Sequence, residues 1–297
     1  MDKPAPPGIR DWLILLGLSL VWGTSYILIK WGLEVFKAEQ IGQLRLGISA
    51  FFVAPIALKY IFKLKRKQLF LLLAVGLTGT ALPSFLFPIA QRQLSSSVAG
   101  ILSSLTPLVT FLMAWFIFRS GASKKQGLGI IVGLAGAILL ALAGGGNSAG
   151  EAAPLRVGYV LLILLACTCY ATSSNLVANY LKKMPSIRIT AISFFLVGFP
   201  ALVYALTFGG VIQTVAEHPQ GWQGLGYVAF LAVFGTVLAS FLFFWLVQRT
   251  GSVFGSTVSY MVPAVALAWG ALDGEFIGLP QVGAFLLILC GVFLTKN

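Results

Sequence analysis

Long apolar stretches, separated by short polar segments, dominate this chain of 297 residues. A helix needs roughly 20 apolar residues to cross the hydrocarbon core of a bilayer, because each residue adds about 1.5 Å. Ten stretches come close to or exceed that length, and no segment between them is long enough for a soluble domain. They cover residues 12–32, 40–62, 69–90, 94–118, 126–144, 157–181, 187–208, 224–247, 252–272 and 278–295. The pattern predicts an all-α integral membrane protein with ten transmembrane helices.

One string of nine residues occurs twice with little change. Residues 79–87 read GTALPSFLF, residues 235–243 read GTVLASFLF, and seven of the nine positions are identical. Further residues recur at the same offset: Ser103, Pro107, Val109 and Gly127 return as Ser259, Pro263, Val265 and Gly283. Chance similarity between apolar helices would not keep Gly, Thr, Ser and Pro in one register, so we interpret the chain as two copies of a five-helix unit.

The number of helices in each copy decides how the copies are oriented. Five is odd, so the second copy must begin on the opposite side of the membrane from the first. The expected fold is a 5+5 inverted-topology repeat with a pseudo-two-fold axis in the membrane plane. Residues 1–144 form the first repeat, residues 145–156 a glycine-rich linker and residues 157–297 the second repeat. Two such halves can rock against each other and open a central site to either side in turn.

Charge is scarce and unevenly placed. Charged residues make up 9% of the chain, and the formal net charge is +12. If the N-terminus is cytoplasmic, fifteen Lys and Arg fall on cytoplasmic segments and four on outer ones, with Arg45 left near the outer end of its span. This positive-inside bias predicts that both termini are cytoplasmic. The basic charge therefore orients the protein in the lipid bilayer, and no nucleic-acid partner is expected.

Three features carry a resemblance to a known family. The five-plus-five helices, the first-helix string VWGTSYILIKWGL and a proline in both the fourth and the ninth helix resemble the drug/metabolite transporter superfamily, in particular its EamA-type ten-helix branch. Within that branch the chain looks most like the bacterial YddG-type exporters of aromatic amino acids. The resemblance implies a monomeric, multi-pass transporter of the bacterial inner membrane with a substrate cavity between its halves.

Polar and aromatic side chains near the bilayer centre form the predicted substrate cavity, because such groups are costly at that depth unless they have a role. The candidates are Trp22, Thr24, Ser25, Thr80, Ser84, Ser103, Tyr170, Thr172, Asn175, Ser240, Tyr260 and Trp269. Each hydroxyl could instead bond its own helix backbone, and each aromatic ring could simply pack. Aromatic walls with a few hydroxyls would suit an amphipathic zwitterion or another small metabolite.

Two prolines are candidate hinges. Pro107 and Pro263 occupy equivalent repeat positions, and a proline in mid-helix removes a backbone hydrogen bond and favours a kink. Lys30 and Arg45 lie near the outer ends of their spans. We expect both side chains to snorkel to the membrane interface, although either could attract a substrate carboxylate at the outer mouth.

Small and sulfur-containing residues within the spans are interpreted as structural. Gly129 and Gly133 form a Gly-x-x-x-Gly pair, which is typical of closely packed helices. The three cysteines Cys167, Cys169 and Cys290 all fall inside spans, without a neighbouring histidine, and are expected to be buried structural thiols. No metal site and no cofactor are predicted.

The sequence also limits the chemistry. No Asp, Glu or His lies at midplane depth, whereas proton-coupled carriers usually need such a group. The chain has no Walker-type phosphate loop, nucleophile elbow or zinc-protease motif. We therefore predict a secondary transporter, not an enzyme, which exports small amphipathic metabolites, most of all amino acids including aromatic ones, as a facilitator. The alternatives are a proton-coupled drug/metabolite antiporter, a channel or an integral-membrane enzyme.

Overall fold

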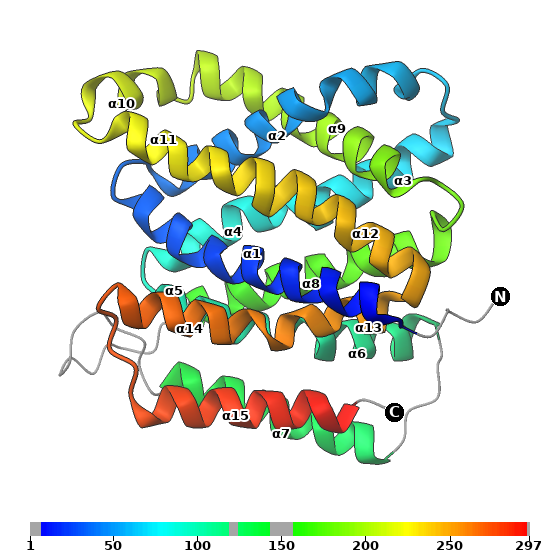
Figure 1. The fold of residues 1–297 in the computed structure, drawn as a ribbon, viewed down its shortest axis with the longest axis vertical. Coiled ribbons are helices and arrows are strands. Elements are labelled where there is room, and N and C mark those ends of the chain that lie inside the picture. The colour runs from blue at the N-terminus through cyan, green and yellow to red at the C-terminus, as the bar shows by residue number, and fades with distance from the viewer. Residues whose placement is uncertain (1–6, 119–123, 143–156, 296–297) are drawn as a thin grey trace.

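The computed structural model describes residues 7–118, 124–142 and 157–295, and every regular element in these ranges is a helix (Figure 1). The predicted linker 145–156 lies outside the described residues. Within the described ranges, seven helical runs are long and apolar enough to cross a membrane by length and composition. They are Ile9–Leu33, Ala38–Ile61, Arg66–Gln91, Ser96–Met113, Val157–Tyr180, Ser186–Thr207 and Gly221–Thr250, with Thr257–Leu272 and Leu279–Gly291 as shorter apolar helices.

The N-terminal half contains helices that match the predicted apolar stretches closely. They are α1 (Ile9–Leu33), α2 (Ala38–Ile61), α3 (Arg66–Gly76), η1 (Leu77–Ala81), α4 (Leu82–Gln91), α5 (Ser96–Ser103), α6 (Thr106–Phe118) and α7 (Lys124–Leu142). The segment η1 is a π-helix that joins α3 to α4 without a break.

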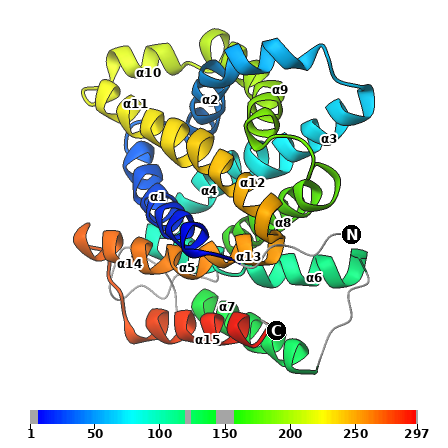
Figure 2. The same cartoon turned by 45° about the vertical axis from the view of Figure 1, so that its right-hand side comes forward.

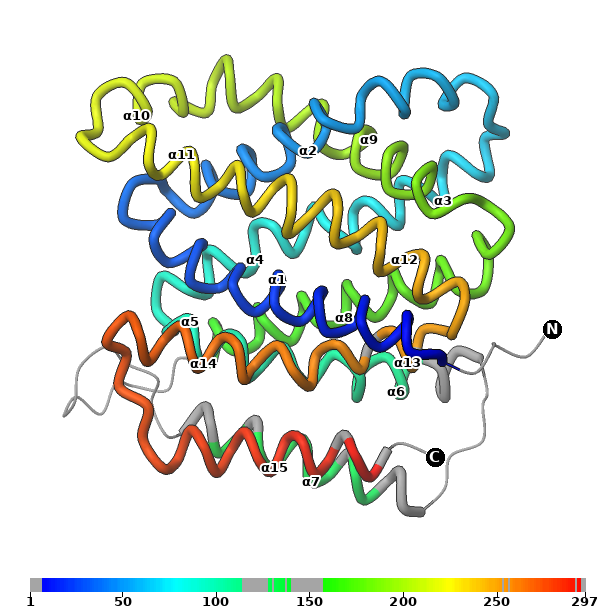
Figure 3. The backbone as a smooth tube through the Cα atoms, viewed as in Figure 1, coloured from blue at the N-terminus to red at the C-terminus, as the bar shows by residue number. Residues whose placement is uncertain are grey.

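The C-terminal half repeats this order with two additional short elements, α10 and η3. Its elements are α8 (Val157–Tyr180), α9 (Ser186–Thr207), α10 (Val211–Glu217), α11 (Gly221–Phe230), η2 (Leu231–Leu238), α12 (Ala239–Thr250), α13 (Ser252–Ser256), η3 (Thr257–Tyr260), α14 (Val262–Leu272) and α15 (Leu279–Thr295). The short helix α10, between the seventh and eighth apolar stretches, was not predicted. The tube in Figure 3 runs continuously from α11 into α12 through η2, which is a π-helix.

Helices from the two halves pair across the molecule. Figures 1 and 2 both show α7 beside α15 at one edge, with α2 and α9 together toward the opposite edge. The helices α1, α4, α8, α12 and α14 lie between these two pairs, and the buried core gathers around them. The middle of the molecule is therefore built from both halves.

The α2–α9 pair depends on glycines that let two backbones approach. A Cβ atom added to Gly47 would lie 3.0 Å from the Leu202 Cα, and one added to Gly198 would collide with the Leu46 carbonyl oxygen. The two approaches are reciprocal, because a glycine of each helix meets the backbone of the other.

The α7–α15 pair has the same reciprocity. A Cβ atom added to Gly136 would lie 2.9 Å from the Ile288 nitrogen, and one added to Gly291 would lie 2.6 Å from both the Gly129 oxygen and the Gly133 Cα. The helix α15 therefore packs closely against the Gly-x-x-x-Gly pair of α7, as predicted.

The repeated string has the same unusual backbone in both halves. Gly79 and Thr80 lie in the π-helix η1, and their counterparts Gly235 and Thr236 lie in the π-helix η2. Single π-helical turns within α-helices are rare and occur often at functional sites. The similarity of sequence thus extends to a shared distortion of the third and eighth predicted spans.

The two candidate hinge prolines lie at helix starts, which corrects the expected mid-helix kinks. Pro107 is the second residue of α6, and Pro263 is the second residue of α14. In the first helical turn a proline needs no partner for its missing N–H. The Ser103 carbonyl oxygen accepts a hydrogen bond from the Thr106 hydroxyl at 2.7 Å instead. The interruption itself precedes each proline, between α5 and α6 and within η3.

The cysteine prediction is correct for two of the three residues. Cys167 and Cys169 are buried in α8, but Cys290 is exposed on the surface of α15.

Candidate functional site

A cavity of about 90 Å³ lies between the two halves of the chain. One water molecule needs roughly 10–15 Å³ of such space, so the cavity has room for several waters or a small organic molecule. Its walls come from α1, α2, η1, α4, α5 and α6 of the first half and from α8, η2, α12, η3 and α14 of the second.

Half of the predicted cavity residues line this space. They are Trp22, Ser25, Thr80, Ser103, Tyr170 and Ser240. The lining also includes polar residues that sequence reasoning did not select, namely Tyr26, Arg45, Thr106, Ser173, Ser174, Thr236 and Ser259. Aromatic rings complete it, with Phe87, Phe243 and Phe244 on its walls. The mixture of hydroxyls and aromatic rings is the one the sequence predicted, but its members differ.

The π-helix η2 organises one wall of the cavity. The Thr236 hydroxyl donates to the Leu231 carbonyl oxygen five residues earlier, at 3.0 Å. The Trp22 ring N–H of α1 donates to the Gly235 carbonyl oxygen at 2.9 Å. The wider π-helical turn thus offers a backbone carbonyl to another helix, and it turns Thr236 toward the cavity.

Arg45 lies inside the protein, which corrects the expectation that it snorkels to the interface. It lies at the end of the second turn of α2, and the residue is only 6% exposed. Its Nε donates a hydrogen bond of 2.7 Å to the Thr236 hydroxyl oxygen. In the described part of the chain, no carboxylate lies within ion-pair distance of Arg45. A buried guanidinium therefore faces the cavity with only neutral protein partners.

Two fully buried hydroxyls of the lining have no hydrogen-bond partner among the described residues. The Thr80 Oγ1 and Ser173 Oγ atoms are buried and unpaired, and both residues are 2% exposed. Ser25 and Ser103 differ, because their hydroxyls donate to the carbonyl oxygens of Val21 and Gly100 in their own helices. Thr80 and Ser173 thus hold free, fully buried hydrogen-bonding capacity in the lining to which Arg45 also belongs.

Six predicted residues lie away from the cavity, and their partners explain why. Trp269 donates its ring N–H to the Thr24 hydroxyl oxygen at 3.0 Å, and this pair joins α1 to α14. Thr172 donates to the Thr168 carbonyl oxygen at 2.8 Å and approaches the Met113 sulfur at 3.6 Å. These side chains point to neighbouring helices because they leave the axis in a different direction from the lining residues beside them.

The other three are Ser84, Asn175 and Tyr260. Ser84 is fully buried, and its hydroxyl has no partner. The Asn175 amide donates to the Ala171 carbonyl oxygen at 2.9 Å and accepts from the Ser252 hydroxyl at 3.1 Å. Tyr260 is half-buried at the end of η3, outside the lining. Asn175 thus ties α8 to α13 and does not face the cavity.

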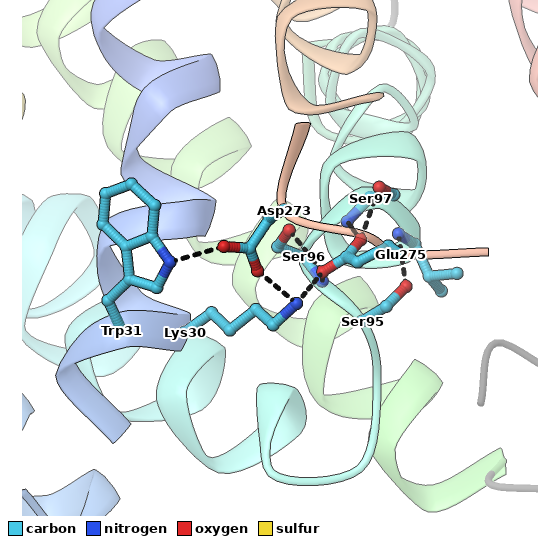
Figure 4. Close-up of polar contacts among 8 residues, drawn as sticks. Lys30, Trp31, Ser95, Ser96, Ser97, Asp273 and Glu275 are labelled. Atoms are coloured by element: carbon cyan, nitrogen blue, oxygen red, sulfur yellow. Dashed lines mark hydrogen bonds and ion pairs between the residues drawn. The ribbon is translucent and has the colours of Figure 1, made fainter. Parts of the chain in front are cut away.

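A charged cluster lies at the end of α1 that carries Lys30. The Lys30 ammonium lies 2.6 Å from Asp273 and 3.0 Å from Glu275 (Figure 4). The Trp31 ring N–H donates to Asp273 at 2.8 Å. Lys30 therefore forms ion pairs with the segment after α14, and the expected snorkelling is wrong for this residue as well.

Glu275 connects this cluster to the first half of the chain. Its carboxylate accepts hydrogen bonds from the backbone N–H groups of Ser96 and Ser97, both at 3.0 Å, and from both serine hydroxyls (Figure 4). Burial alone would raise the pKa of Glu275, but the hydrogen bonds from Ser97 and Ser96 and the contact with Lys30 outweigh it and hold that pKa below its usual value.

Polar contacts also occur at the opposite end of α1. Arg249 at the end of α12 lies 3.0 Å from the fully buried Asp11. Near it, the Gln248 amide donates to the carbonyl oxygens of Leu181 and Met184 at 2.9 and 2.6 Å. Ion pairs therefore tie both ends of α1, the helix that lines the cavity with Trp22 and Ile29, to the second half of the chain.

Comparison with known proteins gives consistent results. The model of the EamA-like transporter family matches residues 11–142 and again residues 157–296. An uncharacterized transporter of Archaeoglobus fulgidus is 21% identical over 97% of this chain and 99% of its own length. The uncharacterized inner membrane transporter YedA of Escherichia coli is 25% identical over 95% of this chain and 89% of its own length.

Two further comparisons cover almost the whole chain. The uncharacterized transporter YyaM of Bacillus subtilis is 25% identical over 97% of this chain and 94% of its own length. A protein of known crystal structure superposes with a TM-score of 0.63 at 16% identity, covering 97% of this chain and 96% of that one. At this identity the superposition establishes the shared fold alone.

Proposed function

Because this chain belongs to the EamA-like transporter family, we propose that it carries small amphipathic metabolites across the bacterial inner membrane by alternating access. Amino acids, including aromatic ones, are the favoured substrates, and export is the proposed direction. The observation that carries the proposal is the central cavity, whose walls come from both halves. A site shared by two similar halves is the arrangement that alternating access requires.

The proposed architecture is a monomer of ten membrane helices in a 5+5 inverted repeat. Three observations support it: the family model matches the chain twice, both halves contain a π-helical segment at the repeated string, and glycines approach reciprocally in the α2–α9 and α7–α15 pairs. Reciprocal contacts are expected when a two-fold axis relates the two halves. Within this architecture the breaks before Pro107 and Pro263 are the proposed hinges.

The proposed orientation places both termini in the cytoplasm. A cysteine introduced at Gln220 should then react with an impermeant reagent from outside, and one at Lys65 should not. Both positions are exposed in the structure. The reverse labelling pattern would contradict the orientation.

The proposed mechanism is facilitated transport down the substrate gradient. Among the described residues, no Asp, Glu or His lines the cavity, so the lining offers no carboxylate or imidazole to carry a proton. A proton-coupled antiporter is the alternative. An imposed pH gradient that drives substrate accumulation in proteoliposomes would favour that alternative.

Counterflow in proteoliposomes tests the site directly. Ser173→Phe fills the cavity from α8, and Thr168→Phe places the same ring on the exposed side of that helix. We expect Ser173→Phe to abolish counterflow of labelled L-phenylalanine and Thr168→Phe to retain it, with both proteins monodisperse. Equal activity of the two variants would mean that this cavity is not the transport site.

A further inference from the structure

Arg45 has an unusual position for a charged residue. It is 6% exposed, it belongs to a membrane helix, and it lines the central cavity. An ionised side chain at such a depth is costly, and it normally pairs with an opposite charge or marks a ligand pathway. The Thr236 hydroxyl oxygen and the neighbouring Tyr170 side chain are neutral, so neither offsets the positive charge.

The rest of the lining offers no such opposite charge. Arg45 is the sole charged side chain among the described residues that line the cavity. The carboxylates of Asp273 and Glu275 are committed to Lys30, and that of Asp11 to Arg249. The positive charge in the cavity is therefore not neutralised by the part of the protein that the structure describes.

A second observation indicates that a ligand supplies the missing group. The Thr80 and Ser173 hydroxyls line the same cavity and have no hydrogen-bond partner. The Ser173 hydroxyl lies directly against the backbone of η1, because a Cβ atom added to Gly79 would lie 2.5 Å from the Ser173 Oγ. Unpaired buried hydroxyls are uncommon and are usually satisfied by water or a ligand.

We propose that Arg45 binds the carboxylate of the transported molecule, with the Thr80 and Ser173 hydroxyls available to its polar groups. A guanidinium is suited to a carboxylate, because its planar set of donors can bind both oxygens at once. This inference rests on the proposed transport function and specifies its substrate class, namely small carboxylic acids with an apolar or aromatic body. The rings of Trp22, Phe87 and Phe243 would contact that body.

Charge balance favours a carboxylate over a phosphate monoester. A carboxylate carries one negative charge, which a single guanidinium neutralises. A phosphate monoester carries about −1.5 to −2 charges at neutral pH and would leave excess negative charge in a buried site. The two classes share the oxyanion chemistry, so the test includes both.

Binding measured by calorimetry with the full-length protein in nanodiscs tests the proposal. The probes share one aromatic ring: L-phenylalanine, hydrocinnamate (carboxylate without amine), phenethylamine (amine without carboxylate) and phenyl phosphate. We expect the unmodified protein to bind L-phenylalanine and hydrocinnamate at least tenfold more tightly than phenethylamine or phenyl phosphate. Arg45→Gln should remove that preference, and Arg45→Lys should restore part of it, because lysine keeps the charge but not the planar donors.

Arg188→Gln is the matched control, because Arg188 is also a helical arginine but stacks on the Tyr60 ring at 4.1 Å, outside the cavity. This variant should bind all probes as the unmodified protein does. If Arg45→Gln unfolds, the probe preference of the unmodified protein and of Arg45→Lys still decides the question. Equal binding of all four probes, tighter binding of phenyl phosphate, no binding of any carboxylate, or an unchanged preference in Arg45→Gln would each overturn the proposal.

Counterflow separates this inference from the proposed function. If the unmodified protein prefers carboxylates in calorimetry but gives no counterflow, the carboxylate site stands and the transport proposal fails. If it gives counterflow of phenethylamine as fast as of hydrocinnamate, transport stands and the carboxylate site is overturned.

Discussion

Lys30 in the last turn of α1 and Glu275 after α14 lie 3.0 Å apart, although 245 residues separate them in the chain. Together with Asp273 they join the first half of the protein to the second at the end of α1 that follows the cavity-lining residue Ile29. A carrier that alternates must break such contacts when that end opens. The cluster therefore makes the closed state of this end sensitive to single substitutions.

Lys30→Gln should make this end of the cavity open more often. The lysine is partly exposed, so the loss is about 1 kcal/mol, which corresponds to a roughly fivefold change in the open fraction. A cysteine at the lining position Ile29, in a protein whose own cysteines are replaced, should then react about fivefold faster with an impermeant thiol reagent. Lys37→Gln, at an exposed lysine, is the control and should not change the rate. Identical rates in both variants would show that the ion pairs do not hold the end closed.

The labelling rate of the cysteine at position 29 should also depend on pH, because Glu275 titrates. Its pKa is lowered in the closed state, so the carboxylate stabilises closure at neutral pH, and that contribution is lost as the pH falls through the lowered value. Because only the thiolate reacts, each rate is divided by that of a fully exposed cysteine at the same pH. We expect this ratio to be constant from pH 8 down to about 5 and to rise below about 4.3, the ordinary pKa of glutamate. Glu275→Gln should abolish the rise. A rise centred near neutral pH would assign the effect to another group.

Gly198→Ala should destabilise the protein, because the added methyl group would collide with the Leu46 carbonyl oxygen and lie 2.8 Å from the Ala50 side chain. Overpacking of this kind costs about 1–3 kcal/mol. The matched variant Gly226→Ala, in α11, adds the same methyl group where no atom lies within 4 Å, and should change stability little. Thermal unfolding in detergent compares the two. Equal melting temperatures would mean that α2 and α9 pack less closely than the structure indicates.

Pro107→Ala and Pro263→Ala should each slow counterflow while changing stability by less than about 1 kcal/mol. Both prolines lie in a first helical turn, where alanine is tolerated equally well. Alanine restores the N–H group, however, and so allows the helix to continue through the break that precedes each proline. Pro55→Ala, at an exposed position in the uninterrupted helix α2, is the control. Unchanged counterflow in both hinge variants would identify the breaks as static.

The helices and the cavity's composition were predictable from sequence, but the direction of individual side chains was not. Thr24 and Ser25 are consecutive and equally deep, yet Ser25 lines the cavity and Thr24 bonds Trp269. Successive residues of an α-helix point about 100° apart. In a helix that is apolar on all sides, no hydrophobic stripe reveals which direction faces the interior.

Arg45 was placed wrongly for a related reason. Charge near the end of an apolar stretch normally reaches the interface, so sequence alone favoured snorkelling. The structure begins α2 at Ala38, which puts Arg45 about 10 Å along the helix, and the π-helix η2 presents Thr236 to its Nε. The partner lies 191 residues away, and its π-helical backbone carries no recognisable sequence signal.

Glu275 also caps the N-terminus of a helix that belongs to the other half of the chain. The first N–H groups of any helix lack partners within it, and in α5 those of Ser96 and Ser97 donate to this distant carboxylate, whereas the Val98 N–H donates to the nearby Ser95 hydroxyl at 3.3 Å. Withdrawal of Glu275 would therefore leave two adjacent amides open to water while the third keeps its cap. Hydrogen–deuterium exchange of the Ser96 and Ser97 amides, relative to that of Val98, should therefore report how often this end opens, without any introduced label. Glu275→Gln should speed exchange at Ser96 and Ser97 but not at Val98.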